Sequence, residues 1–125
     1  MILQQTIIKV SDNSGAKTAK CIKILGGYKK RFATAGDVIV VVINQLRNRL
    51  KKTSKVKKGA IYKALVIRTK NCILSKGHTL TFFNDNAISL MNKQGDPLAT
   101  RIVGPVSKKV RMKHYKFVGI SAGFA

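Results

Sequence analysis

The sequence has no glutamate and no tryptophan, and its 125 residues include only two cysteines and two prolines. Cys21 and Cys72 stand 51 positions apart, which gives neither a disulfide framework nor a metal-ligand spacing. Two such cysteines are typical of a protein from a reducing compartment. We therefore predict two buried or half-buried thiols and no bound metal.

Acidic residues are almost as scarce, because the chain has only four aspartates and no other acid. Each aspartate adjoins a glycine, an asparagine or a proline, and a short carboxylate in such a place accepts backbone N–H groups where the chain turns. We expect Asp12, Asp37, Asp85 and Asp96 to form turns. Almost no acid is then left to pair with the cations.

The scarcity of titratable residues also argues against catalysis. His78 and His114 are 36 positions apart, and the sequence has no paired carboxylates, Cys/His dyad or zinc-binding pattern. The segment 14–17 lacks the full pattern of a phosphate-binding loop. We predict that the protein is not an enzyme, needs no cofactor, and leaves both imidazole rings in solvent or against a nucleic acid.

Long apolar runs are missing as well. The longest uncharged runs, 38–46 and 117–125, have nine residues each, whereas a helix needs roughly twenty apolar residues to cross a bilayer. The first five residues carry no charged side chain, and no cleavage pattern follows them. We predict neither a membrane span nor a secretory signal.

What the chain has in excess is positive charge, since 25 lysines and arginines give a formal net charge of +21. Self-repulsion of this size opposes a compact fold unless a polyanion neutralises it. The chain is nevertheless 45% hydrophobic, so it can bury a core, unlike a disordered basic tail. We infer a folded protein whose cations bind nucleic acid, with an affinity that falls steeply as salt rises.

Segments rich in β-branched residues, separated by glycine or asparagine turns, predict a mainly β fold. In the segment 60–70, one face has Ile61, Leu65 and Ile67 and the other has Tyr62, Ala64 and Val66, so both faces are largely apolar. That pattern suits a small curved sheet that is filled inside and covered outside, and we predict a closed five-stranded β-barrel. The candidate strands are 6–10, 20–25, 37–46, 60–70, 79–83 and 87–91.

No linker divides the chain, so we predict a single domain over residues 1–125. The barrel and its basic loops would occupy 1–96, and a loop with short helices would occupy 97–125. Val106 and Val110 lie four positions apart, which favours a short helix over 106–112. Gly15 and Gly27 stand in turn contexts, and we expect a positive φ at both.

The cations gather in three clusters. A solvated surface would explain one cluster, but three clusters without acidic counterweight predict an RNA-binding surface. Lysine binds phosphate without reading bases, so we expect recognition of RNA shape rather than sequence. The eight Phe and Tyr would be needed largely for the core, which leaves few to stack on bases. The clusters are Arg47, Arg49, Lys51, Lys52, Lys55, Lys57 and Lys58; Lys29, Lys30 and Arg31, which lie between Tyr28 and Phe32; and Lys108, Lys109, Arg111, Lys113 and Lys116.

Several motifs follow one another in order along most of residues 4–106. They are Asp-Asn-Ser-Gly-Ala-Lys at 12–17, Cys-Ile-Lys-Ile-Leu-Gly-Gly at 21–27, Lys-Arg-Phe-Ala at 30–33, Gly-Asp-Val-Ile at 36–39 and Ser-Lys-Val-Lys-Lys-Gly at 54–59, followed by segments 66–70, 84–87 and 95–106. In this order the motifs resemble those of the universal large-subunit ribosomal protein L-fourteen family, in its bacterial and organellar form.

The resemblance implies a five-stranded barrel with a small helical carboxyl-terminal part, bound directly to large-subunit rRNA at the face that meets the small subunit. It also implies contacts with neighbouring large-subunit proteins, a bridge to small-subunit rRNA, and a docking surface for a ribosome-silencing factor, placed on Thr100 and Arg101. The predicted rRNA contacts are Asn13, Ser14, Lys17, Lys29, Lys30, Arg31, Arg47, Arg49, Lys51, Lys52, Lys55, Lys57, Lys58, Arg68, Lys70, Lys108, Lys109, Arg111 and Lys113.

Two departures from the family pattern bear on the source of the protein. The stretch 44–53 is longer and more basic than the family's loop, and no acid follows Asp96 where the family carries glutamates. Together with 19 lysines against 6 arginines, they favour a mitochondrial ribosome, with a plastid or the bacterial cytoplasm as alternatives. Two other functions stay open, a free barrel that binds single-stranded nucleic acid and an enzyme with a basic substrate-binding surface.

Overall fold

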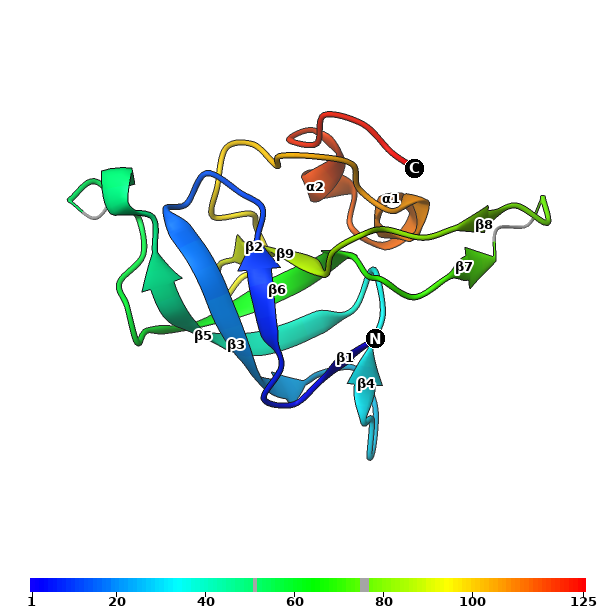
Figure 1. The fold of residues 1–125 in the computed structure, drawn as a ribbon, viewed down its shortest axis with the longest axis horizontal. Coiled ribbons are helices and arrows are strands. Elements are labelled where there is room, and N and C mark those ends of the chain that lie inside the picture. Colours follow the sequence, from blue (N-terminus) through cyan, green and yellow to red (C-terminus); the bar gives the residue numbers. More distant parts are fainter. Residues whose placement is uncertain (51, 75–76) are drawn as a thin grey trace.

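The structure is a computed structural model that describes residues 1–50, 52–74 and 77–125. Five strands close into a barrel in the order β2-β3-β5-β6-β9 (Figure 1). Neighbouring strands are antiparallel except β2 and β9, which run parallel and close the barrel. The predicted mainly β fold with a closed five-stranded barrel is therefore confirmed. The strands are β2 (Ile7–Val10), β3 (Ala16–Ile24), β5 (Val38–Leu46), β6 (Ile61–Arg68) and β9 (Ala87–Met91).

Two short ribbons lie outside the barrel. In one, β1 (Ile2–Leu3) pairs with β4 (Phe32–Ala33); in the other, β7 (Ile73–Leu74) pairs with β8 (Leu80–Thr81). The predicted strand 79–83 is confirmed only at Leu80–Thr81, which pair within the second ribbon and not in the barrel, and Leu80 stays 63% exposed. Strand β3 also begins four residues earlier than predicted, since its first residues continue the pairing with β5.

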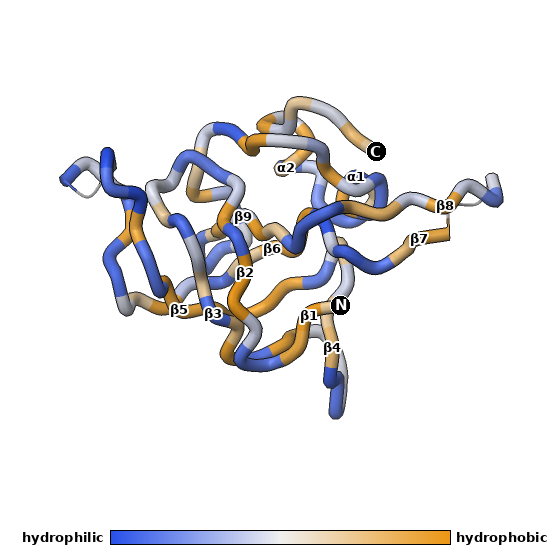
Figure 2. Tube along the Cα trace, in the orientation of Figure 1, coloured by the Kyte–Doolittle hydropathy of each residue, from blue (hydrophilic) through white to orange (hydrophobic). Residues whose placement is uncertain are grey.

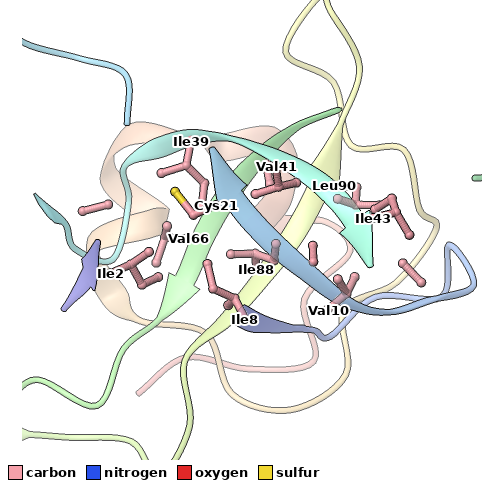
Figure 3. Packing of buried hydrophobic residues seen from close by; sticks show 14 of the residues in the cluster. Ile2, Ile8, Val10, Cys21, Ile39, Val41, Ile43, Val66, Ile88 and Leu90 are labelled. Atoms are coloured by element: carbon pink, nitrogen blue, oxygen red, sulfur yellow. The ribbon is translucent and has the colours of Figure 1, made fainter. Parts of the chain in front are cut away.

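The barrel interior is filled by aliphatic and small side chains (Figure 3). Ile8 and Val10 of β2 meet Ile39 and Val41 of β5 there, with Cys21 of β3 among them. Such side chains fit the narrow lumen of a five-stranded barrel. Of the eight Phe and Tyr, the structure buries two, and four are exposed, so the expectation that the core consumes the aromatic residues is wrong. The buried ones are Phe83 and Phe117, and the exposed ones are Tyr28, Phe32, Phe82 and Tyr115.

A second core lies on the outer face of the barrel. Leu65 and Ile67 of β6 point away from the lumen and pack with Val106, Val110 and Phe117 of the carboxyl-terminal segment. The prediction that this strand is buried on both faces is confirmed for residues 64–67, because one face lines the lumen and the carboxyl-terminal segment covers the other. It is wrong at the start of the strand, where Ile61 is 65% exposed.

The carboxyl-terminal segment forms two short helices, α1 (Lys108–Lys113) and α2 (Tyr115–Val118). The helix predicted over 106–112 starts later, because the backbone of Val106 is taken up by hydrogen bonds with Gly123 and Ala125. A 3₁₀ turn, η1 (Asn48–Leu50), lies in the loop between β5 and β6. No helix in the described part of the chain is long and apolar enough to cross a membrane.

Of the two turn glycines predicted to have a positive φ, one has it and the other does not. Gly15 has a φ of 101°, as predicted, and this left-handed conformation favours glycine. Gly27 is not among the residues with positive φ; its neighbour Gly26 takes that role with a φ of 98°. The prediction for Gly27 is therefore wrong by one position.

Candidate nucleic-acid interface

Other parts of the chain engage all four aspartates, beginning with Asp12, which is buried. Its carboxylate accepts hydrogen bonds from the backbone N–H groups of Ser14 at 3.1 Å and Leu90 at 2.8 Å, and from the Ser89 hydroxyl at 3.3 Å. The Ser14 hydroxyl also donates to it. Ser14, a predicted rRNA contact, is buried and turned inward, and the arrangement ties the turn before β3 to β9.

Asn13 holds the loop that carries Thr100 and Arg101. Its Oδ1 accepts the backbone N–H of Thr100 at 2.9 Å and that of Arg101 at 3.4 Å, and its Nδ2 donates to the Thr100 hydroxyl. Thr100 and Arg101 are themselves exposed. The structure thus joins a predicted rRNA contact to the two residues predicted to contact protein.

Arg68, also predicted to bind rRNA, is buried with a side chain only 6% exposed. Its guanidinium donates to Asp85 at 2.7 Å, to the Ser11 hydroxyl at 3.0 Å and to the carbonyl oxygens of Val103 at 3.3 Å and Pro105 at 3.1 Å. The hydrogen bond from Arg68 outweighs desolvation and lowers the pKa of Asp85. We exclude Arg68 from the interface, because its donors already join β6 to the carboxyl-terminal segment.

Asp37 links two of the three predicted clusters. Its carboxylate lies 2.9 Å from Nζ of Lys30 and 3.9 Å from Nζ of Lys113, so the loop before β4 meets helix α1 there. Burial by itself would raise the pKa of Asp37, but hydrogen bonds from the Thr34 backbone and from Lys30 outweigh it, and the pKa is lowered. Lys30 is therefore half-buried in an ion pair, unlike its neighbours Lys29 and Arg31, which are exposed.

The loop between β5 and β6, together with Lys17 of the adjacent strand β3, carries the first group of exposed cations, which we call the loop-end cations. It extends from one end of the barrel (Figure 1), and Figure 2 shows it as a mostly hydrophilic stretch. Beside it lies a hollow of about 520 Å³ whose lining includes Lys17 and Lys58. Arg47 is half-buried and donates to the Val10 carbonyl at 3.1 Å, and Lys51 lies outside the described residues. The loop-end cations are Lys17, Arg49, Lys52, Lys55, Lys57 and Lys58.

The second group, the helix-end cations, lies on the loop before β4 and on helix α1. Asp37 links these elements, since its carboxylate lies 2.9 Å from Nζ of Lys30 in the loop and 3.9 Å from Nζ of Lys113 on the helix. In Figure 1 they lie toward the end of the barrel opposite the β5–β6 loop. The helix-end cations are Lys29, Arg31, Lys108, Lys109, Arg111 and Lys113, all of them exposed.

Some cations were missed because they are isolated in the sequence. Lys23 of β3 and Lys63 of β6 both lie opposite Val40 in the sheet, so they share the outer wall of the barrel. A lysine at an outward-facing strand position is a usable signal, but these lysines form no cluster in the sequence. Lys70, which was predicted, is exposed just after β6, where its backbone N–H donates to Asn86 at 2.8 Å.

No group of three or more His, Cys, Asp or Glu that could hold a metal ion occurs among the residues that the structure describes. His114 does not face solvent as predicted, because it is half-buried between α1 and α2 with its Nε2 3.3 Å from the Gly36 carbonyl. Of the thiols, Cys21 is buried and burial raises its pKa, but Cys72 is exposed, contrary to the prediction.

A comparison with known protein families agrees with this architecture. The family described as Ribosomal protein L14p/L23e matches residues 1–124, which is nearly the whole chain. Proteins of this family are structural constituents of the large ribosomal subunit and not enzymes. The resemblance found in the sequence motifs is thereby confirmed: this basic five-stranded barrel belongs to the ribosomal protein L14p/L23e family.

Proposed function

We propose that the protein binds large-subunit rRNA directly through the loop-end and helix-end cations, at the face of the large subunit that meets the small subunit. The observation that carries this proposal is the placement of charge. The carboxylates accept hydrogen bonds or pair with cations within the fold, while twelve predicted cations remain exposed in two groups. Their attraction for phosphate is therefore largely uncompensated by the protein itself.

The two groups suit two separate segments of folded RNA. Apart from Lys17 of β3, these cations lie on loops or on a short helix, and the closed barrel sets the position of each segment. Lysine, the main residue in both groups, contacts phosphate as a point charge and carries little base information. Recognition then depends on the shape of two phosphate-lined grooves and on the distance between them.

Sedimentation and cross-linking test this role together. We expect almost all of the protein to sediment with large subunits on a sucrose gradient. In purified particles, rRNA cross-links should come from both ends of the barrel, for example from Lys58 and Lys109. A mostly free pool, or particles in which both ends cross-link only to protein, would contradict the proposal.

Thr100 and Arg101 supply a second surface, which we propose for protein contacts. Both are exposed, and Asn13 holds their loop by accepting two backbone N–H groups and donating to the Thr100 hydroxyl. The family resemblance supports neighbouring large-subunit proteins, a bridge to small-subunit rRNA and a ribosome-silencing factor as partners. Arg101→Ala should weaken capture of a silencing factor without changing the salt dependence of rRNA binding, and full capture would remove this assignment.

We also propose a mitochondrial ribosome as the location of the protein, with a plastid or the bacterial cytoplasm as the alternatives. A further proposal is that residues 1–125 form a single domain. The lysine bias and the departures in residues 44–53 and in the tail support the location. The second core, which joins β6 to the carboxyl-terminal segment, supports the single domain. Fractionation of the source cell, followed by detection of the protein in mitochondrial ribosomes or elsewhere, decides the location.

A further inference from the structure

Tyr28 is the most exposed of the large apolar side chains that the structure describes, with 92% of its surface in solvent. It stands in the loop from β3 to β4, which projects away from the barrel below β4 in Figure 1. A single exposed apolar residue is ordinary on a protein surface. Tyr28 differs because of the backbone that holds it and the charges that surround it.

The loop is anchored at its base. On one side Phe32 pairs with Leu3 across the β1–β4 ribbon, and on the other Gly26 turns the chain with a φ of 98°. Lys30 folds back to Asp37 at 2.9 Å. Lys29 has a φ of 51°, a left-handed conformation that few lysines adopt. Ordered turns therefore present the aromatic ring at the tip.

The charges beside the ring have one sign. Nζ of Lys29 lies 5.4 Å from the centre of the Tyr28 ring, within the range of a cation–π contact. Arg31 is exposed, and among the described residues the one carboxylate that an ion pair brings to this loop, that of Asp37, is already held by Lys30. A partner for this tip must therefore combine a flat apolar face with negative charge.

An unpaired nucleotide has both parts, because its base presents a π-face and its phosphates are anionic. We propose that Tyr28 stacks on an unpaired base of large-subunit rRNA, on the ring face opposite Lys29, while Lys29 and Arg31 contact the flanking phosphates. This inference rests on the proposed rRNA binding and adds a contact to a base to those made with phosphates.

Three substitutions at one position test the stacking. The full-length chain is titrated with deproteinised large-subunit rRNA at several salt concentrations. Tyr28→Phe keeps the ring and should bind within about twofold of the wild type. Tyr28→Ala and Tyr28→Leu remove it and should weaken binding about 5- to 150-fold, with no change in the salt slope because no phosphate contact is lost. Thermal melts should be unchanged, since the ring touches little of the protein.

The outcomes separate the two proposals. If the wild type binds rRNA and Tyr28→Ala binds equally well, stacking is wrong and the rRNA interface stands. Wild-type strength in Tyr28→Leu would show an apolar contact without stacking, and would also overturn the inference. If the wild type itself fails to bind rRNA in dilute buffer, the proposed function is wrong and the stacking contact with it.

Discussion

Arg68 and the loop-end cations carry the same charge and do opposite things. The guanidinium of Arg68 is buried, pairs with Asp85 and donates to two carbonyl oxygens of the carboxyl-terminal segment. Lys52 and Lys57, on the β5–β6 loop, are exposed. The difference is the nearby carboxylate, since a buried charge is tolerated only when it is paired and hydrogen-bonded.

The comparison shows how a protein with so few acids divides its cations. Asp37 and Asp85 each hold a cation where two parts of the chain meet, and Asp96 pairs with Lys116 near the carboxyl terminus. Most of the exposed cations that these acids do not pair lie in the loops and on α1, where they can bind a polyanion. The acids thus select which cations stabilise the fold.

Among the variants considered, Arg68→Ala should lower the free energy of unfolding the most. Removing the guanidinium takes away the main partner of Asp85 and leaves the Val103 and Pro105 carbonyls without a donor, so the free energy of unfolding should fall by about 2–4 kcal/mol. Urea denaturation at fixed salt measures this loss of stability. Lys70→Ala, two positions further along and exposed, is the matched control and should stay within about 0.5 kcal/mol of the wild type. Equal losses of unfolding free energy in the two variants would contradict the distinction between the buried Arg68 and exposed cations.

A pair of glycines tests the packing around the same guanidinium. Gly104 has a φ of 87° and Gly95 a φ of 90°, so an alanine at either pays a similar left-handed strain of about 1–2 kcal/mol. A Cβ at Gly104 would lie 2.9 Å from the guanidinium of Arg68, whereas in the described structure nothing lies within 4 Å of one at Gly95. Gly104→Ala should therefore unfold more easily than Gly95→Ala, by about 1–3 kcal/mol. Equal stability of the two variants would mean that Arg68 can move aside.

Acid should weaken the buried pairs selectively. A carboxylate whose folded pKa lies below its unfolded value of about 3.9 adds stability above that pH, and the contribution is lost as the pH falls through the folded pKa. Asp37 has such a lowered pKa. Between about pH 5 and pH 2 the wild type should lose more unfolding free energy than Asp37→Asn, which has no proton to gain. Parallel losses would show that the ion pair with Lys30 adds nothing.

The smallest effect on stability is expected at the loop-end cations. Lys52→Ala and Lys57→Ala remove exposed charges from a strongly basic protein, so the free energy of unfolding should change by less than about 0.5 kcal/mol. A loss above 1 kcal/mol by urea denaturation would show that this loop stabilises the fold and is not reserved for a partner.

Much of the barrel could be predicted from local patterns. The two apolar faces of β6 indicated a strand buried on both sides, because Ala64 and Val66 had to meet one core and Leu65 and Ile67 another. The turn context predicted the positive φ of Gly15 correctly. It could not tell Gly26 from Gly27, since either glycine of the pair could adopt the left-handed conformation. The ribbon strands of two residues each carry too short a pattern to predict.

The candidate site was less predictable, because ion pairing depends on contacts between distant residues. Arg68 and Asp85 are 17 positions apart, and nothing in the local sequence of either indicates that they meet inside the protein. Lys29 and Lys30 look alike in the sequence, yet only Lys30 turns toward Asp37. Counting charges located the basic loops correctly but could not separate structural cations from exposed ones.

The salt dependence of rRNA binding tests the central claim most directly. In a triple variant with alanine at Lys52, Lys57 and Lys58, the slope of log affinity against log salt should fall by about one per residue. A double variant with alanine at Lys9 and Lys116, which already pair with Asp85 and Asp96, should keep nearly the wild-type slope. The same change per residue in both variants, or no change in the triple variant, would contradict the account.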